Sequence, residues 1–599
     1  MAIAAIIVLV WTIRSVLTHK LSISVSNGSL GFVLLASVSF ISLLVSSINK
    51  VEALINPFGF PTFAALAVVT LCVPVLLQKT SHAAISWFLI AFTTILAIIT
   101  IYQFAGMNAV MFPGIAFLSD RLWTPTGSPL ATLAILAIMI PFVISRVHDV
   151  WKQRHEAIVP ILILILIVNT VGVSILLWQI IPKLPGSIFP LTAGWSIALE
   201  VLKNPKWIAT GVGAENFVTA FNLGKPLSYN VSPLWNIRFN ASSSFVFHML
   251  TVYGILGVAA TIYLLKIMME KTNRGGISIP CTLAAIAFLL LPPSIDVLTV
   301  ATLLLMLSED RAIREIQIPK KQKWIPPVLF LVVLAGVIGS GFALFRFYRA
   351  EFSYFRSLVR ANGNDGTGAY NFQIQAISNN PYMSRYHMAL SQTSIALAQT
   401  LSSASDSAAQ TSLIMQLAQQ AVREAKIAIS LAPNGLSWEN LARIYSLLIP
   451  STNGAYDWSV TSFRQATTLD PANPMLHMEL GFIFTRQKNY SQAITEFLRA
   501  ASLKPNYASA FYNLANVYRA NGDTQNAIQA LVQTQLFLDP VTSDYQLVTN
   551  TLKDLNEQVN AKESSSSAKK LTGPAQTLIT PEPSPVAVPT LTLPDSAGP

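Results

Sequence analysis

Long apolar runs, separated by short polar breaks, fill the sequence from residue 1 to about residue 348. A helix needs about 20 apolar residues to cross the core of a bilayer, and most of the runs approach that length. The ten runs lie near 2–18, 30–47, 60–78, 84–105, 129–145, 157–181, 244–265, 277–291, 294–308 and 325–345. This pattern predicts an all-α membrane domain, residues 1–348, with about ten spans.

Composition supports that prediction and excludes several classes of protein. Charged residues make up only 11% of the chain and hydrophobic residues 52%, whereas an average soluble protein has about 25% charged residues. A fully soluble enzyme is therefore excluded. The only two cysteines, Cys72 and Cys281, lie inside apolar runs, so a disulfide framework and a cysteine-based zinc site are excluded. We expect no metal and no cofactor.

The charge balance of +11 indicates topology rather than nucleic-acid binding, because Lys and Arg concentrate in cytoplasmic loops. One set of alternate loops holds thirteen basic residues: Lys20, Lys79, Arg146, Lys152, Arg154, Lys266, Lys271, Arg274, Arg311, Arg314, Lys320, Lys321 and Lys323. The opposite short loops hold only Lys50 and Arg121. We therefore expect a multi-pass protein of the cytoplasmic (inner) membrane. Residues 182–243 and everything after the last span are predicted to lie outside the cytoplasm.

Residues 349–560 are Ala- and Gln-rich and repeat themselves with a period of 34 residues. Leu480, Gly481 and Phe484 recur as Leu514, Ala515 and Tyr518, and Pro471 recurs as Pro505. Small residues at this period, with proline between the repeats, resemble the tetratricopeptide repeat (TPR), a pair of packed helices. We expect an extracytoplasmic TPR α-solenoid that binds protein partners on its concave face. Residues 561–599 are rich in Ser, Thr and Pro and are predicted to be a disordered tail.

The segment 182–243, called the long loop below, is the place where chemistry is expected. It is far longer than an ordinary connection between helices. It contains, in order, Trp195, the turn Gly211-Val212-Gly213 with Phe217, and the run Trp235 to Asn240, and the next span includes Tyr253-Gly254. The two glycines do not follow a strand, so the pattern does not predict a dinucleotide site.

Read as an ordered set, these residues resemble the O-antigen ligase/polymerase family of polytopic membrane glycosyltransferases. The resemblance is detailed over about 180–260 and architectural over the rest of the membrane domain. It implies transfer of a glycan from a polyprenyl-diphosphate carrier to an acceptor hydroxyl on the external membrane face, without an obligatory metal. Family members with C-terminal tetratricopeptide repeats occur, which fits this chain.

The sequence departs from the family at the residues expected to carry catalysis. Counting back from Gly254, the family's His-Asn pair falls on Ser243 and Ser244. A serine hydroxyl cannot by itself act as general base, whereas a histidine can at neutral pH. His248, about one helical turn later, is the candidate for a displaced base. Its alternative role is that of a hydrogen-bonded histidine buried in a helix.

Three basic residues of the predicted external loops are candidates for binding the diphosphate: Arg238, Lys225 and Arg121. Arg238 is preferred because arginine binds phosphate oxygens bidentately; its alternative role is an interfacial anchor beside Trp235. Lys225 and Arg121 are otherwise solvated loop charges. The further substrate-binding candidates are Trp235, Asn240, Ser243 and Ser244, while Gly211, Gly213 and Phe217 are expected to shape the loop.

Two functions follow from these observations. The first is an integral-membrane glycan ligase or polymerase in surface polysaccharide or glycoprotein biosynthesis. The alternative is a catalytically impaired family member that acts as a membrane-anchored TPR scaffold for envelope proteins. The position of the His248 ring discriminates between them, because an accessible cavity favours the enzyme and tight packing favours the scaffold. No predicted span has a central acidic or histidine cluster, which argues against a proton-coupled transporter.

Overall fold

The computed structural model describes residues 2–77, 81–111, 118, 120–154, 157–183, 189–270, 276–308, 312–319, 322–402 and 408–570. The chain divides into two compact units, Met1–Ala510 and Phe511–Pro599. Several residues named above lie outside the described residues: Lys79, Lys271, Arg274, Arg311, Lys320 and Lys321, together with residues 571–599 of the predicted tail.

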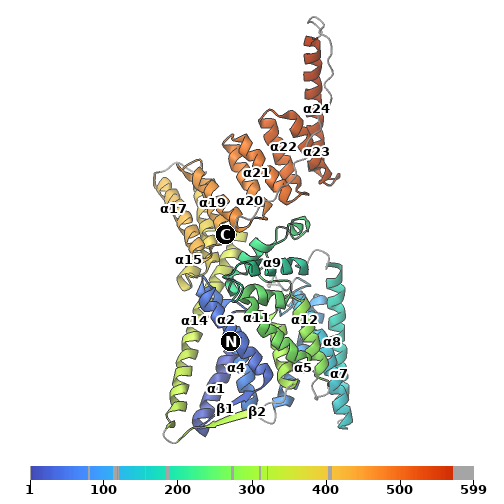
Figure 1. Ribbon diagram of the computed structural model, residues 1–599, viewed down its shortest axis with the longest axis vertical. Coiled ribbons are helices and arrows are strands. Elements are labelled where there is room, and N and C mark those ends of the chain that lie inside the picture. Colours follow the sequence, from blue (N-terminus) through green and yellow to red (C-terminus); the bar gives the residue numbers. More distant parts are fainter. Residues whose placement is uncertain are drawn as a thin grey trace. The chain divides into compact units, whose positions relative to one another are not determined.

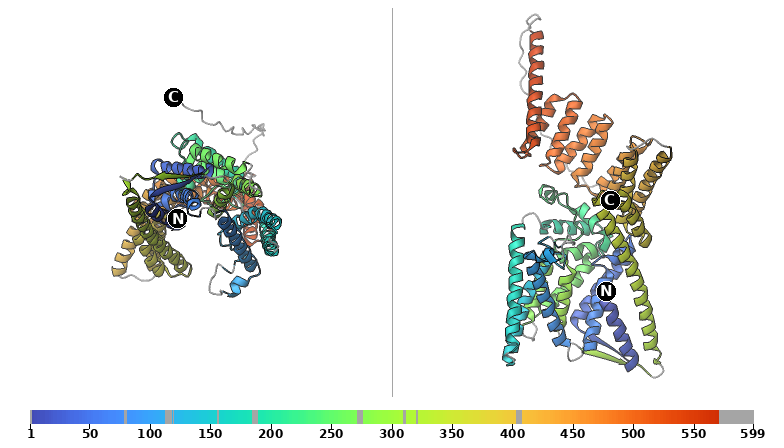
Figure 2. Two further views of the ribbon diagram at one scale, coloured as in Figure 1. Left: turned by 90° about the horizontal axis from the view of Figure 1, so that it is seen from below. Right: turned by 180° about the vertical axis from the view of Figure 1, so that it is seen from behind.

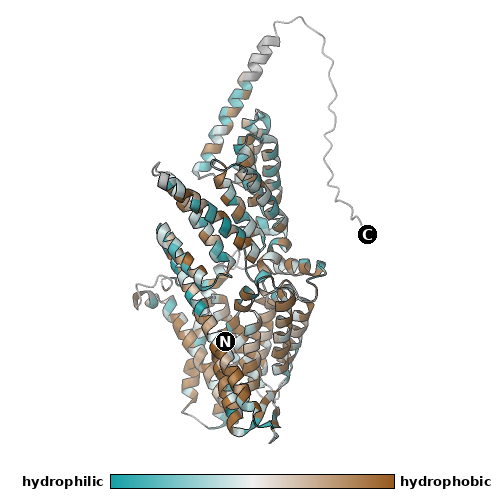
Figure 3. Cartoon of the chain, turned by 90° about the vertical axis from the view of Figure 1, so that its left-hand side faces the viewer, coloured by the Kyte–Doolittle hydropathy of each residue, from teal (hydrophilic) through white to brown (hydrophobic). Residues whose placement is uncertain are grey.

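Every predicted span coincides with a helix. The apolar helices are α1 (Ala2–Thr18), α2 (Asn27–Val45), α4 (Phe60–Leu77), α5 (Ser81–Phe104), α7 (Pro129–Lys152), α8 (Val159–Ile180), α11 (Phe245–Met269), α12 (Ser278–Leu290), α13 (Ile295–Ser308) and α14 (Ile325–Asn362). Short helices α3 (Lys50–Ile55) and α6 (Met107–Met111) lie between them. All of these helices except α1 and α14 contribute to one large core, and Figure 3 shows how strongly hydrophobic the apolar helices are compared with the helices that follow.

Seven helices in the described part of the chain are long and apolar enough to cross a membrane, judged by length and composition. They are Asn27–Val45, Lys50–Leu77, His82–Phe104, Pro129–Lys152, Val159–Ile180, Phe245–Met269 and Ile325–Asn362. The other three, α1, α12 and α13, are shorter apolar helices. Helix α14 continues well past the apolar run that predicted it, so the proposed domain boundary at residue 348 falls inside a helix of 38 residues.

A two-stranded antiparallel sheet, which the apolar pattern did not predict, pairs a segment near the start of the apolar region of the sequence with a segment near its end (Figures 1 and 2). Strand β1 (Lys20–Val25) pairs with β2 (Ala312–Gln317), with Lys20 opposite Gln317 and Val25 opposite Ala312. Lys20 and Glu315 form an exposed ion pair of 2.9 Å. The sheet therefore brings two of the predicted cytoplasmic loops to the same end of the helices.

The long loop is itself folded. It contains the helices α9 (Leu191–Lys203) and α10 (Phe217–Gly224) and the 3-10 turns η3 (Ile181–Lys183), η4 (Ala214–Asn216) and η5 (Leu227–Val231). Helices α9 and α10 are amphipathic and pack against each other, because each buries one apolar face. Phe189, Phe221, Tyr229 and Phe239 form an aromatic cluster, with the rings of Phe189 and Phe239 stacked at 4.7 Å. This cluster fixes the part of the loop that carries Arg238.

Helical hairpins follow α14. Those of the first unit comprise α15 (Gly366–Asn379), α16 (Ser384–Ser402), α17 (Ala408–Leu431), α18 (Gly435–Leu448), α19 (Ala455–Leu469), α20 (Pro474–Arg486) and α21 (Tyr490–Leu503). Consecutive helices pack as pairs, and a Cβ added to Gly481 would lie 2.5 Å from the Phe497 ring. The predicted small residue therefore lets α20 and α21 approach each other closely. Helix α22 (Ala508–Ala520) contains the boundary between the units, and the second unit continues with α23 (Thr524–Leu536) and α24 (Ser543–Lys570).

Candidate functional site

The Gly211-Val212-Gly213 turn of the long loop is joined to α11 by backbone hydrogen bonds. The amide of Val212 donates to the Thr251 carbonyl and that of Gly213 to the Val252 carbonyl, both at 3.1 Å. In the opposite direction, the amides of Ile255 and Leu256 donate to the carbonyls of Ile208 and Ala209, at 2.9 and 3.2 Å. The two glycine motifs of the sequence therefore meet in the fold.

Glycine is needed on both sides of this junction. Gly254 interrupts the helical backbone of α11 with a φ of +65°, which frees the nearby carbonyls to pair with the loop. Gly211 has a φ of +68°, and a Cβ there would lie 2.2 Å from the Val252 carbonyl carbon. Only glycine combines this backbone conformation with such a close approach. Gly213, with a φ of +94°, comes immediately before η4.

Glu215 anchors the end of this turn against the C-terminus of α2. Its carboxylate accepts hydrogen bonds from the Ile48 amide at 2.9 Å and from the Ser47 hydroxyl at 3.1 Å. Burial raises the pKa of the Glu215 carboxyl above its ordinary value, although these hydrogen bonds oppose the shift. The turn is therefore held from two sides, by α2 and by α11.

Ser243 and Ser244 lie where α11 begins, close to the Trp195 helix. Ser244 is the N-cap of α11, and its hydroxyl accepts a hydrogen bond from the Phe247 amide. The Ser243 hydroxyl has no hydrogen-bond partner among the described residues and lies against Gly194, where a Cβ would be 2.0 Å from it. Ser244 thus has a clear structural role in starting the helix.

The His248 ring lies among packed aromatic side chains. Only 2% of the residue is exposed. Its ring centroid is 5.4 Å from that of Phe58 and 5.3 Å from that of Phe217, the first residue of α10. Neither ring nitrogen has a hydrogen-bond partner among the described residues. This environment does not match the accessible cavity expected of a general base.

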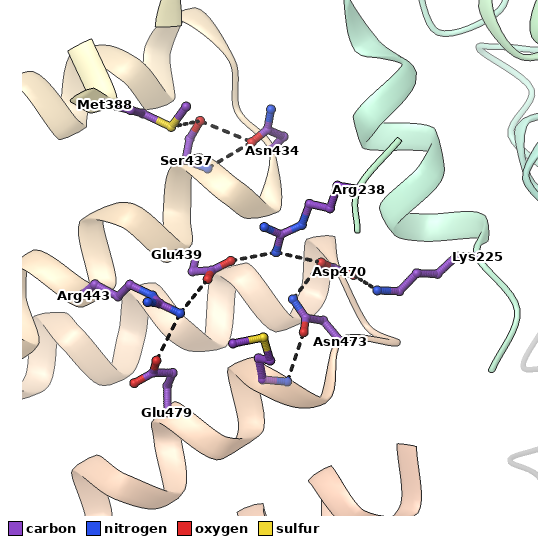
Figure 4. Close-up of polar contacts among 11 residues, drawn as sticks. Lys225, Arg238, Met388, Asn434, Ser437, Glu439, Arg443, Asp470, Asn473 and Glu479 are labelled. Atoms are coloured by element: carbon purple, nitrogen blue, oxygen red, sulfur yellow. Dashed lines mark hydrogen bonds and ion pairs between the residues drawn. The ribbon is translucent and has the colours of Figure 1, made fainter. Parts of the chain in front are cut away.

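Arg238 and Lys225, called the basic pair below, converge on two acidic side chains of the repeats, Glu439 and Asp470, called the carboxylate pair (Figure 4). Arg238 forms ion pairs of 2.8 Å with Glu439 and 3.4 Å with Asp470. Lys225 lies 3.3 Å from the other oxygen of Asp470. The Asp470 side chain is fully buried and that of Lys225 is 4% exposed. One carboxylate therefore lies between two cations from the long loop.

Burial and the neighbouring carboxylates shift the pKa values of the basic pair in opposite directions. Burial lowers the pKa of the Lys225 ammonium below its ordinary value, although the Asp470 charge opposes the shift. Burial also disfavours the charged guanidinium of Arg238, but Glu439 and Asp470 outweigh it, so its pKa is raised. The carboxylate pair therefore favours the charged form of both Arg238 and Lys225, against the effect of burial.

The network continues into the repeats. Arg443 bridges Glu439 at 3.0 Å and Glu479 at 3.1 Å, and the Asn473 amide donates to Asp470 at 3.0 Å (Figure 4). Burial raises the pKa of the Glu479 carboxyl, with Arg443 opposing the shift. The carboxylate pair is thus supported by neighbours within the repeats.

The other predicted binding residues are dispersed. The Trp235 ring lies 5.2 Å from that of Tyr507, with the Lys504 ammonium 4.7 Å from the Trp235 ring centre, so it contacts the repeats. Asn240 is exposed. Arg121 is also exposed, and within the described chain no hydrogen bond or ion pair joins it to the basic pair. Among the described residues, no group of three or more His, Cys, Asp or Glu could hold a metal.

The sequence interpretation did not identify Asp470, Glu439 or Lys504 as site residues. Asp470 and Lys504 stand 34 residues apart, and each precedes a proline that ends a repeat. Proline pushes the preceding residue into an extended backbone, and both residues have φ values near −140°. A charged residue before each junction proline was the signal that could have identified Asp470 and Lys504, whereas no such signal marks Glu439.

A cavity of about 450 Å³ lies within the second unit, lined by Asn516, Arg519, Ala520, Thr524, Leu555 and Gln558. Its lining residues come from α22, α23 and α24, and four of the six are polar or charged. It contains none of the residues predicted from the sequence.

Comparison with known proteins identifies the repeats. A family model described as TPR repeat matches residues 481–522. No curated protein matches the chain. Similar solved structures include the thermophilic TPR protein TTC0263 of Thermus thermophilus (14% identity, TM-score 0.26, covering 34% of this chain and 98% of that one). PilW, a type IV pilus biogenesis factor, has 14% identity and a TM-score of 0.27, covering 37% and 93%. YrrB, a TPR protein with an unusual peptide-binding site, has 13% identity and a TM-score of 0.24, covering 34% and 90%.

Proposed function

We propose that this chain is a multi-pass protein of the inner membrane that transfers a glycan from a polyprenyl-diphosphate carrier to an acceptor hydroxyl. The observation that carries the proposal is the convergence of Arg238 and Lys225, from one long loop, on a single buried carboxylate. Two cations that meet at one anion have the arrangement needed to bind a diphosphate. The order of the loop motifs, which resembles the O-antigen ligase/polymerase family, supplies the substrate class.

In this reaction the acceptor oxygen attacks the anomeric carbon, and the bond from that carbon to the diphosphate oxygen breaks. The polyprenyl diphosphate leaves with the electron pair. The basic pair would stabilise the negative charge that develops on this leaving group, which is a large contribution in a water-poor site. The acceptor proton requires a base, and His248, the candidate from the sequence, could take it only after its packing against Phe58 and Phe217 opens.

A transfer assay with the purified full-length chain tests the proposal. Polyprenyl-diphosphate glycans and candidate acceptors are supplied, and product is measured for the parent and for Arg238→Ala. We expect the variant to lose at least about 100-fold in rate, as is typical when one charge-stabilising group is removed. Lys206→Ala, at an exposed lysine of the same long loop, is the matched control. Full activity of Arg238→Ala would exclude the phosphate role.

A second function, a membrane-anchored TPR scaffold for envelope proteins, is favoured by one specific observation. His248 is buried between Phe58 and Phe217, and the family's His-Asn position is occupied by Ser243 and Ser244. TPR arrays bind partners on their concave faces. Glycan transfer by the full-length chain that depends on His248, without capture of any envelope protein, would contradict the scaffold.

A further inference from the structure

The repeats already occupy the basic pair of the proposed donor site. Asp470 contributes one oxygen to Lys225 and the other to Arg238, and Glu439 takes a second contact of Arg238. Carboxylates and phosphates bind to the same cationic groups through the same kind of charged hydrogen bond. The carboxylate pair therefore occupies the position that a diphosphate would need.

The repeats also form hydrogen bonds with Asn230, which lies between Lys225 and Arg238 in the sequence. The Asn230 amide donates to the carbonyls of Ala472 and Leu503, at 2.7 and 2.9 Å. In return, the Lys504 ammonium donates to the Asn230 carbonyl at 2.8 Å. Because Asp470 and Lys504 occupy equivalent positions in successive repeats, two repeat junctions contact the loop in a regular way.

The two sides of this contact differ in what they would lose on separation. Glu439 keeps an ion pair with Arg443, and Asp470 keeps its hydrogen bond from Asn473. The basic pair would keep no ion pair, because among the described residues no carboxylate of the long loop pairs with Lys225 or Arg238. Separation would leave the basic pair without an anionic partner, and a diphosphate that took the place of the carboxylates would supply one.

We propose that the carboxylate pair is an internal substitute for the donor diphosphate, so that binding of the lipid-linked donor releases the repeats from the long loop. This inference rests on the proposed function. The exchange replaces one anion by another at the basic pair, and no covalent step is involved. The repeats are thereby in contact with the loop when the donor is absent and free of it when the donor is bound.

Hydrogen exchange on the full-length chain in phosphatidylcholine nanodiscs tests the exchange, with inorganic pyrophosphate as the probe and sulfate at equal ionic strength as the control anion. We expect pyrophosphate to increase amide exchange in 435–473 while 225–238 stays protected. Asp470→Asn should lower the pyrophosphate concentration for half effect by about tenfold, because a competing closed state is weakened. If Asp470→Asn does not fold, Glu439→Gln replaces it as the test variant, with the same expected result. Glu496→Gln, which neutralises a carboxylate paired with His477 elsewhere in the repeats, is the matched control and should behave as the parent.

Three results separate the possible failures. If the parent and Asp470→Asn bind pyrophosphate equally tightly, the release mechanism is overturned and the anion site of the proposed function stands. If Asp470→Asn loosens 225–238 but no pyrophosphate binds, the anion exchange is overturned together with the donor site. If sulfate releases the repeats as well as pyrophosphate does, the contact responds to salt and the proposed specificity for a diphosphate is overturned.

Discussion

Replacing Gly211 by alanine tests how closely the long loop and α11 must approach each other. Two effects contribute. The left-handed backbone at φ +68° costs an alanine about 1 kcal/mol. In addition, the new Cβ would lie 2.2 Å from the Val252 carbonyl carbon, about 1.2 Å short of ordinary contact at 3.4 Å.

Separating the backbones by that distance would break the hydrogen bonds of the Val212 and Gly213 amides, which are now 3.1 Å long. Leaving such buried groups unpaired costs about 1–3 kcal/mol each, so we expect a total loss of about 4 kcal/mol. Gly127→Ala is the matched control, because Gly127 has a φ of +71° and nothing within 4 Å of its added Cβ. It should lose only the backbone cost of about 1 kcal/mol.

Hydrogen exchange of the full-length chain in nanodiscs measures the difference. The opening free energies of the Val212 and Gly213 amides should fall sharply in Gly211→Ala and remain unchanged in Gly127→Ala. Equal effects of the two variants on thermal stability, with protection retained at Val212, would refute the argument from close approach.

Three further predictions concern the site and the repeats. His248→Leu should keep or raise the thermal midpoint, because it removes a buried polar group that has no partner among the described residues; a clear loss would show that a ring nitrogen is hydrogen-bonded. Asp470→Asn should lower stability by about 3 kcal/mol. It also lowers the already depressed pKa of Lys225 further, so the unfolded chain binds more protons than the folded one, and the loss of stability should shrink as pH rises from 7 toward 10. A loss of stability that does not depend on pH in thermal unfolding would contradict this. Gly481→Ala should destabilise the chain by about 2 kcal/mol through contact with the Phe497 ring, and the double variant with Phe497→Leu should recover most of the loss.

The positions of the apolar helices could be predicted from the sequence because hydrophobic runs are a local signal. The residues at which these helices end could be predicted less well. Helix α14 extends to Asn362, seventeen residues beyond the apolar run predicted to end at 345, because the polar sequence that follows contains no proline and no glycine before Gly363. Hydrophobicity marks the part of a helix suited to a bilayer core, whereas propensity and capping determine where the helix stops.

The surroundings of the candidate site could not be predicted in the same way. The sequence drew attention to Arg238 and Lys225, but their partners Glu439 and Asp470 lie more than 200 residues away along the chain. Pairing between such distant side chains depends on how the repeats fold back on the loop, which no local pattern records. The sequence left open whether His248 is a base or a buried histidine for the same reason, since Phe58 and Phe217, which bury it, come from separate segments of the chain.

The small sheet formed by β1 and β2 has a consequence for synthesis of the chain. Lys20 and Glu315 are 295 residues apart, so β1 leaves the ribosome long before its partner strand exists. During that interval β1 presents unpaired backbone groups that invite wrong pairing. The order of translation therefore leaves β1 unpaired until residues 312–317 are made, and α14, which packs against α1, follows later still. Chains truncated before this strand should accumulate as aggregates or be degraded, even though most of the apolar helices are already complete.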